Sequence, residues 1–126
     1  MMTDNTDLAI PKIVDFGLAK IMGPQEKANE PFGTLGYVAP EILQKKPYSF
    51  NCDIWSLGCI VYALCCSSLP FDNNDHKETI RMTCEDPVNF SLPQWKNYSK
   101  NCLDFISKLL IKKPEDRINI DDVISH

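Results

Sequence analysis

The chain has 126 residues, the size of one typical domain, and its 13 basic and 17 acidic residues give a formal net charge of −4. Hydrophobic residues make up 44% and charged residues 24%, which excludes a disordered tail, a collagen-like repeat and a low-complexity chain. The mild acidity argues against a nucleic-acid-binding protein, which would carry a basic stripe, and gives no reason to expect attraction to anionic membranes.

No segment of the sequence has the pattern of a membrane span or a secretion signal. The longest apolar run, residues 57–66, is far shorter than the roughly 20 residues that a membrane helix needs. The first ten residues contain neither the basic nor the apolar part of a signal peptide. We therefore expect a cytoplasmic protein whose six cysteines are reduced, and the absence of any C-x-x-C spacing argues against a zinc site.

The front of the chain is predicted to contain the only extended structure. Residues 8–20 have apolar pairs on both sides of Asp15-Phe16-Gly17, a pattern that predicts two short strands around a turn. The segments that follow are predicted to be an exposed loop, an irregular stretch and a short helix or turn, over residues 22–32, 33–40 and 41–45.

The rest of the chain is predicted to be helical. The strongest helix covers residues 51–66, with Asn51 as N-cap and Asp53 in its first turn, and its apolar residues on all sides predict a buried helix. Further helices are predicted near residues 77–84, over residues 99–110 with Ser99 as cap, and from about residue 119. The fold class is thus mainly α.

Several short motifs occur in a fixed order, although each is weak by itself. They are Asp15-Phe16-Gly17, Gly33-Thr34-Leu35-Gly36-Tyr37-Val38, Ala39-Pro40-Glu41, Asp53-Ile54-Trp55-Ser56-Leu57-Gly58, Leu69-Pro70-Phe71 and Pro114-Glu115-Asp116-Arg117. Together they resemble the C-terminal lobe of a eukaryotic protein kinase. The resemblance implies a helical lobe with short β-strands around the Asp-Phe-Gly turn, an incomplete kinase domain over residues 1–126 and an activation segment over residues 15–41.

The resemblance also implies ATP and Mg²⁺ as cofactors. Asp15 would be the Mg²⁺ ligand, because phosphoryl transfer needs the phosphate charge neutralised by a metal held on hard oxygen atoms. Phe16 would pack under the other lobe, and Gly17 would give the backbone its freedom to switch. The alternative interpretation of Asp15 is an ordinary turn aspartate between two strands.

The segment after the loop implies a protein substrate phosphorylated on serine or threonine. Thr34 matches the threonine whose hydroxyl contacts the catalytic carboxylate in Ser/Thr-specific kinases, and Leu35, Tyr37 and Val38 would form the substrate pocket. A kinase partner is a further candidate, whereas no nucleic-acid or membrane partner is expected.

Five more residues are implied to have structural roles. Glu41 and Arg117 match a buried ion pair that anchors the substrate loop to the helical core. Asp53 matches a buried aspartate that holds the backbone of the catalytic loop, with a plain helix cap as the alternative. Ile60 and Leu64 match the apolar column beneath the adenine.

Glu30 lies four residues before Thr34, where kinases activated by loop phosphorylation carry Ser or Thr. A fixed carboxylate supplies part of a phosphate's charge, so a contact with Lys20 would hold the loop without modification. This pattern, with Asp86-Pro87-Val88-Asn89-Phe90 and Trp95, is similar to the calcium-dependent and calmodulin-regulated kinases. A solvated loop acid is the alternative interpretation of Glu30.

The 126 residues contain no Gly-rich loop, strand lysine or catalytic loop. We therefore expect a truncated kinase that begins just past the catalytic Asn and ends in its last helix, with weak ATP and Mg²⁺ binding and no activity alone. The alternatives are a non-catalytic kinase fragment that binds a protein, and an unrelated helical interaction module.

Overall fold

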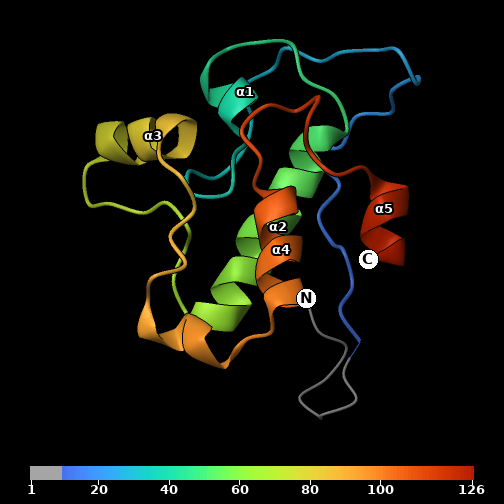
Figure 1. Ribbon diagram of the computed structural model, residues 1–126. Helices are drawn as coiled ribbons and strands as arrows, with labels where there is room; N and C mark the ends of the chain where they lie inside the picture. The colour runs from blue at the N-terminus through green and yellow to red at the C-terminus, as the bar shows by residue number, and fades with distance from the viewer. Residues whose placement is uncertain (1–9) are drawn as a thin grey trace.

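The structure, a computed structural model, describes residues 10–126 and is mainly helical (Figure 1). In chain order its elements are α1 (Pro40–Leu43), α2 (Asn51–Cys66), α3 (His76–Glu85), the 3₁₀ helix η1 (Pro93–Asn97), α4 (Lys100–Leu109) and α5 (Ile120–Ser125). All five predicted helices are confirmed to within a few residues, whereas η1 was not predicted. The mainly α fold class is therefore confirmed.

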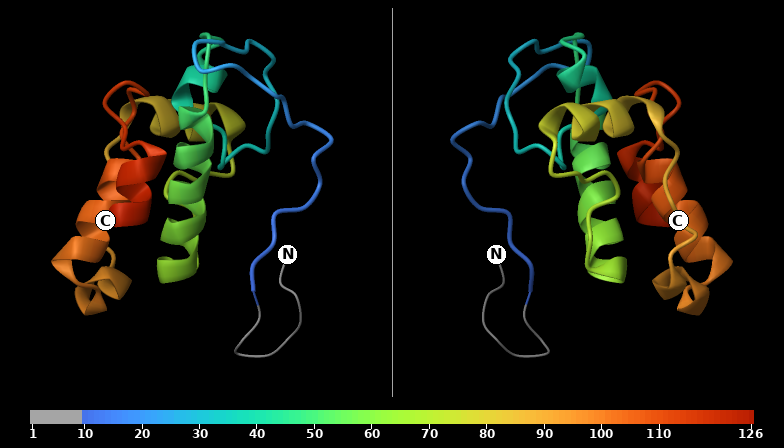
Figure 2. Two further views of the ribbon diagram at one scale, coloured as in Figure 1. Left: turned by 90° about the vertical axis from the view of Figure 1, so that its right-hand side faces the viewer. Right: turned by 90° about the vertical axis from the view of Figure 1, so that its left-hand side faces the viewer.

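The two short strands predicted over residues 8–20 are absent from the described part of that segment. Residues 8 and 9 lie outside the described residues, and no β-strand forms among residues 10–126, where pairing is limited to isolated bridges such as Ala28 with Tyr48. Ile13 is 85% and Ile21 100% exposed, and Figure 2 shows an extended arm beside the helices. An extended segment becomes a strand only when a neighbouring segment pairs with its backbone over several residues, and no such ladder is described for residues 10–20.

Helix α2 forms the centre of the core. It packs against α4 and η1, and Figure 1 shows α2 and α4 side by side. The Trp55 ring stacks on Phe71 with 5.8 Å between centroids, and Tyr62 contacts Trp95 of η1 at 4.8 Å. Ile106 of α4 is fully buried against this cluster. These aromatic pairs, rather than α2's own helix propensity, hold its position.

Two predictions about α2 are wrong. The N-cap is Phe50 rather than Asn51, whose side-chain amide instead donates a 2.6 Å hydrogen bond to the Pro114 carbonyl. The helix is also not buried on all sides, because Ile60 is 46% and Leu64 79% exposed. Among the described residues, α4 and η1 cover one side of α2 and leave an apolar strip on the other.

The other helix starts follow local chemistry. The Ser99 hydroxyl accepts a hydrogen bond from the Cys102 amide and so caps α4, as predicted. Asn119 and Asp75 cap α5 and α3 in the same way. Each side-chain oxygen satisfies a backbone N–H that has no partner within its own helix, which fixes where these helices begin.

Candidate functional site

Two glycines shape the segment that precedes α1. Gly33 has φ +134° and Gly36 φ +97°, values that L-residues rarely adopt. A Cβ at Gly33 would lie 2.6 Å from Val38 Cγ2, and one at Gly36 would lie 2.8 Å from Leu69 Cδ1. The amide of Tyr37, the residue after Gly36, donates a hydrogen bond to the Thr34 carbonyl at 3.0 Å. The spacing of the two glycines therefore sets the turn that presents Thr34 and Tyr37.

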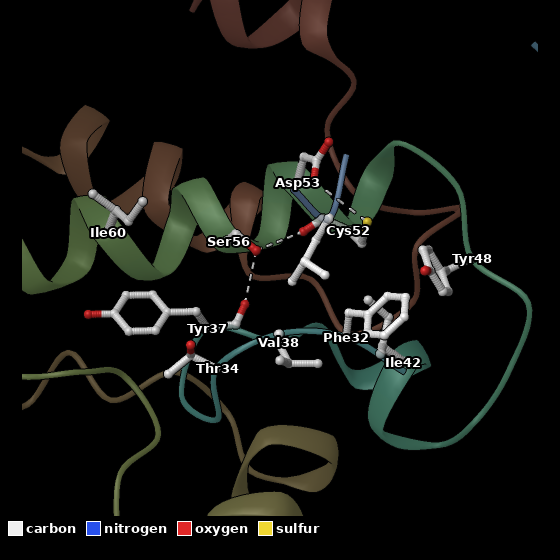
Figure 3. Close-up of a pocket in the computed structure, with 12 residues that line it drawn as sticks. Phe32, Thr34, Tyr37, Val38, Ile42, Tyr48, Cys52, Asp53, Ser56 and Ile60 are labelled. Carbon is white, nitrogen blue, oxygen red and sulfur yellow. Dashed lines mark hydrogen bonds between the residues drawn. The ribbon is translucent and has the colours of Figure 1, made fainter. Parts of the chain in front are cut away.

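This turn and α2 enclose a pocket of about 430 Å³. Figure 3 shows Thr34, Tyr37 and Val38 on one wall and Cys52, Asp53, Ser56 and Ile60 of α2 on the other. The Ser56 hydroxyl joins the walls, since it donates to the Tyr37 carbonyl at 3.0 Å and lies 3.2 Å from the Cys52 carbonyl. The sequence did not predict a role for Ser56, although Ser56 lies in the motif that begins at Asp53.

The predicted substrate residues do not all share this pocket. Leu35 lines a separate hollow of about 190 Å³ together with Ile42 and Leu43. Val38 lines both hollows and is buried, whereas Tyr37 is 37% exposed. Val38 therefore forms the partition between the two spaces.

The Asp15 turn borders a neighbouring hollow of about 630 Å³, which also includes Asp53. Asp15 has φ +63°, and its carboxylate accepts from the Gly17 amide at 3.2 Å, an Asx-turn that makes this conformation tolerable. Phe16 is 68% exposed, so its predicted packing partner is not among the described residues. Asp15 and Asp53 both border this hollow, Asp15 from the turn and Asp53 from the first turn of α2.

Asp53 is exposed, so the expectation of a buried aspartate is wrong for this chain. It lies in the first turn of α2, and its carboxylate accepts from the Cys52 thiol at 3.8 Å. Burial, reinforced by the charge of Asp53, raises the pKa of Cys52 to about 12. Burial of a carboxylate requires donors around it, and no backbone amide from another segment reaches Asp53 among residues 10–126.

The donor set fits Mg²⁺ only in part. Mg²⁺ in phosphate sites is held by one or two carboxylates and by the phosphates themselves, so the exposed carboxylate of Asp15 is a suitable ligand type. No group of three or more His, Cys, Asp or Glu side chains suited to a metal occurs within the described chain. A protein-only metal centre is therefore not formed by these residues.

The predicted contact between Lys20 and Glu30 is confirmed. The two side chains approach to 3.4 Å and are 43% and 48% exposed. The other carboxylate oxygen accepts from the Asn29 amide at 3.1 Å. The pKa of Glu30 is lowered, first by backbone N–H donors of Glu30 and Asn29 and then by the charge of Lys20. Glu30 therefore contacts both Lys20 and the backbone of its own loop.

Tyr48 is a loop anchor that sequence reasoning missed. Its amide and carbonyl pair with those of Ala28 at 3.0 and 2.9 Å, and its hydroxyl donates to the Glu30 carbonyl at 2.8 Å. Ala28 is 1% exposed. An isolated bridge leaves no periodic pattern, so the only available signal was an aromatic residue beside Pro47 at the end of a polar stretch.

Glu41 and Arg117 form the predicted bidentate, buried salt bridge. The two N···O distances are 2.9 and 3.0 Å, and the side chains are 3% and 0% exposed. Arg117 also donates to the carbonyls of Ile111 at 2.9 Å and Asn51 at 2.6 Å. This arrangement ties α1, the start of α2 and the segment before α5 to one guanidinium.

Three features thus lie around the start of α2: the Asp15 turn, the glycine-shaped turn and the Glu41–Arg117 bridge. The sequence that contains them matches the protein kinase domain over residues 1–126. The chain belongs to the protein kinase family. It is 37% identical to serine/threonine-protein kinase 17A of Oryctolagus cuniculus over 126 residues, covering 100% of this chain and 32% of that protein.

Two further relatives agree with this family. A probable myosin light chain kinase of Dictyostelium discoideum is 40% identical over 123 residues, which are 98% of this chain and 31% of that protein. CDPK-related kinase 5 of Arabidopsis thaliana is 36% identical over 126 residues, 100% of this chain and 21% of that protein. The chain therefore spans about a third or less of the curated relatives it matches. Within residues 10–126, no helix is long and apolar enough to span a membrane.

Proposed function

We propose that this chain is part of a serine/threonine protein kinase that transfers a phosphoryl group from Mg²⁺-ATP to protein hydroxyl groups. The observation that carries the proposal is the placement of the Asp15 turn and the Thr34 pocket in adjoining hollows that share Asp53, Ser56 and Ile60. The names of the relatives support the Ser/Thr specificity. The six free thiols are in keeping with a cytoplasmic protein.

In this proposal residues 15–41 form the activation segment. Asp15 would hold Mg²⁺, which when bound neutralises the charge on the transferred phosphate. Thr34, Tyr37 and the buried Val38 line the pocket where the substrate segment would lie. Gly17 keeps the Asp15 carboxylate in its turn through its backbone amide.

We further propose that the loop is ordered without phosphorylation. Lys20, Glu30 and Tyr48 already connect the two ends of the loop through hydrogen bonds. The similarity to the probable myosin light chain kinase and to CDPK-related kinase 5 supports the proposal that this chain is related to the calcium- and calmodulin-regulated kinases. In a chimera that joins this chain to the preceding part of a relative's kinase domain, Glu30→Ala and Lys20→Ala should then lower kinase activity, and Glu26→Ala is a matched control in the same loop.

The test of Ser/Thr specificity uses a chimera in which this chain follows the preceding part of the amoebal relative's kinase domain. We expect it to phosphorylate a serine peptide and not the matching tyrosine peptide. Thr34→Ser should retain the rate, whereas Thr34→Val should lower kcat at least about a hundredfold if the hydroxyl assists the transfer. Equal rates for the serine and tyrosine peptides, or for both Thr34 variants, would contradict the proposal.

A protein-binding module is the second candidate function. The observation that favours it is the exposed apolar strip on α2, where Ile60 and Leu64 have no cover among the described residues. Such a strip favours association with another protein surface. Leu64→Glu should reduce self-association of the chain in sedimentation experiments, whereas Ile124→Glu, an equally exposed apolar site on α5, should not.

A further inference from the structure

A further cavity, of about 600 Å³, lies between α1, the end of α3 and the segment that follows α4. Figure 1 shows that segment running beside α1 and α3. The cavity shares no lining residue with the Thr34 pocket. Its walls include Lys27, Lys46, Lys112 and Lys113, which come from three separate parts of the chain. A chain with a net charge of −4 therefore concentrates four ammonium groups around one opening.

The negative charges in this cavity do not neutralise the lysines. Glu41 lines it, but both of its carboxylate oxygens are bound by Arg117. Glu115 is the remaining carboxylate of the wall. Within the described part of the chain, Lys27, Lys46 and Lys113 form no ion pair. The wall therefore carries an excess of positive charge that is available to a ligand.

Lys112 has a different role from the other three lysines. Its ammonium donates to the Thr83 carbonyl at 2.7 Å and to the Met82 carbonyl at 3.3 Å, and it lies 3.5 Å from the centroid of the Phe71 ring. Burial lowers its pKa to about 8. Lys112 thus connects the last turn of α3 to the core. A negatively charged ligand would therefore pair with the other three lysines, at the rim of the cavity.

We propose that this cavity binds an acidic segment of a partner protein, with its carboxylates paired to Lys27, Lys46 and Lys113. A small anion is best held at one helix end or in a backbone nest. The lysines at the rim of this cavity lie instead on separate loops. Pro40, Pro47 and Pro114 supply apolar surface between the charges. An extended peptide places alternate side chains on one face, about 7 Å apart, and so matches separated charges along an apolar wall.

The site requires neither ATP nor phosphoryl transfer, so it is independent of the proposed kinase reaction. Its test uses the full 126-residue chain and a fluorescein-labelled peptide of alternating glutamate and glycine, with a glutamine–glycine peptide for comparison. Fluorescence anisotropy is measured at low and high salt. We expect binding of the glutamate peptide alone, weakened as salt shortens the Debye length from about 30 Å toward 3 Å.

The decisive variant is Lys46→Glu with Lys113→Glu. Its matched control is Lys45→Glu with Lys77→Glu, which changes the net charge equally at exposed lysines that do not line the cavity. The cavity variant should weaken binding at least about tenfold, and the control should leave it within about twofold. Thermal melts of both variants establish that the fold is retained, as expected for exposed positions.

Three results would overturn the proposal. They are no binding of the glutamate peptide at low salt, equal weakening by the cavity and control variants, and displacement of the peptide by sodium phosphate at constant ionic strength. The second result would mean that only net charge matters. The third would mean that the cavity is a site for a small anion rather than for a protein segment.

Discussion

Arg117 donates hydrogen bonds to one carboxylate and to several backbone carbonyls. Its guanidinium is shared between the Glu41 carboxylate and backbone carbonyls of Ile111, Asn51 and Lys112. Its charge also lies 5.2 Å from the centroid of the Trp55 ring. A planar group with five N–H donors can satisfy all of these at once, whereas an ammonium cannot. The role is therefore specific to arginine and not to positive charge.

Arg117→Leu should destabilise the chain by about 3–5 kcal/mol, because it leaves the buried Glu41 carboxylate without its partner. Arg117→Lys should recover only part of that loss. Both are measured by urea unfolding. Arg81→Leu is the control, because its pair with Glu78 is exposed and should change stability by no more than about 1 kcal/mol. Similar losses at Arg81 and Arg117 would contradict a buried clamp.

Glu30 offers a test of what holds the loop. Its pKa lies below the ordinary value of 4.5, so its charged form favours the folded loop above that value and the effect is lost as pH falls through the lowered pKa. Since backbone N–H donors are the larger cause, Lys20→Ala should return the pKa only part of the way. Carbon-detected NMR titration of the Glu30 carboxyl measures this.

The control for that titration is Lys27→Ala, a lysine of the same loop that makes no ion pair with Glu30. It should leave the pKa of Glu30 unchanged. A complete return to 4.5 in Lys20→Ala would instead mean that the ion pair, and not the backbone, orders the loop.

At the scale of the elements, α2 lies close to the end of α4 at Gly58. A Cβ added at Gly58 would lie 2.8 Å from Leu110 Cδ2 and 2.9 Å from Leu109 Cβ. Gly58→Ala should therefore destabilise the chain by about 1–3 kcal/mol, although alanine favours helix formation. Denaturant unfolding measures the change.

Gly23→Ala is the matched control for this substitution, because nothing lies within 4 Å of an added Cβ there. It should be neutral or slightly stabilising, since it reduces the freedom of the unfolded chain. A stabilising Gly58→Ala would contradict the close approach of α2 and α4.

The sequence predicted elements well where the signal is local. The period of apolar residues defined α4, and Ser99 and Asn119 marked helix starts by chemistry that acts within three residues. Asn51 looked like the same kind of cap, but its amide makes a contact with Pro114 63 positions away. No local pattern distinguishes these two uses of a polar side chain.

Some contacts of the candidate site were predicted from the sequence and others were not. The Glu41–Arg117 bridge followed from the family resemblance, and both partners lie within the described chain. Burial of Asp53 and strands around Asp15 were predicted but are not found, because burial and strand formation both depend on contacts with other segments. Among residues 10–126, Asp53 is exposed and no β-strand forms. Tyr48 and the lysine-lined cavity were missed because their groups meet only after folding.

For the molecule as a whole, we distinguish the residues that fold the chain from those that phosphoryl transfer needs. The 126 residues contain the Asp15 turn, whereas neither a Gly-rich loop nor a His-Arg-Asp motif of a catalytic loop occurs among them. We expect this chain alone to transfer no phosphate to any peptide, because the reaction depends on positioning and on charges that several of those groups supply. Transfer of radiolabelled phosphate that is abolished by Asp15→Asn would contradict this.

We propose that Asp15 serves phosphoryl transfer when this chain is joined to the preceding part of a kinase domain. The measurement is kcat/KM of that chimera on a serine peptide, with Asp15→Asn compared with Asp104→Asn, an exposed aspartate of α4. We predict that Asp15→Asn lowers kcat/KM at least about a hundredfold, through loss of the metal-binding charge, and that Asp104→Asn leaves it unchanged. Equal activity of the two variants would contradict the claim.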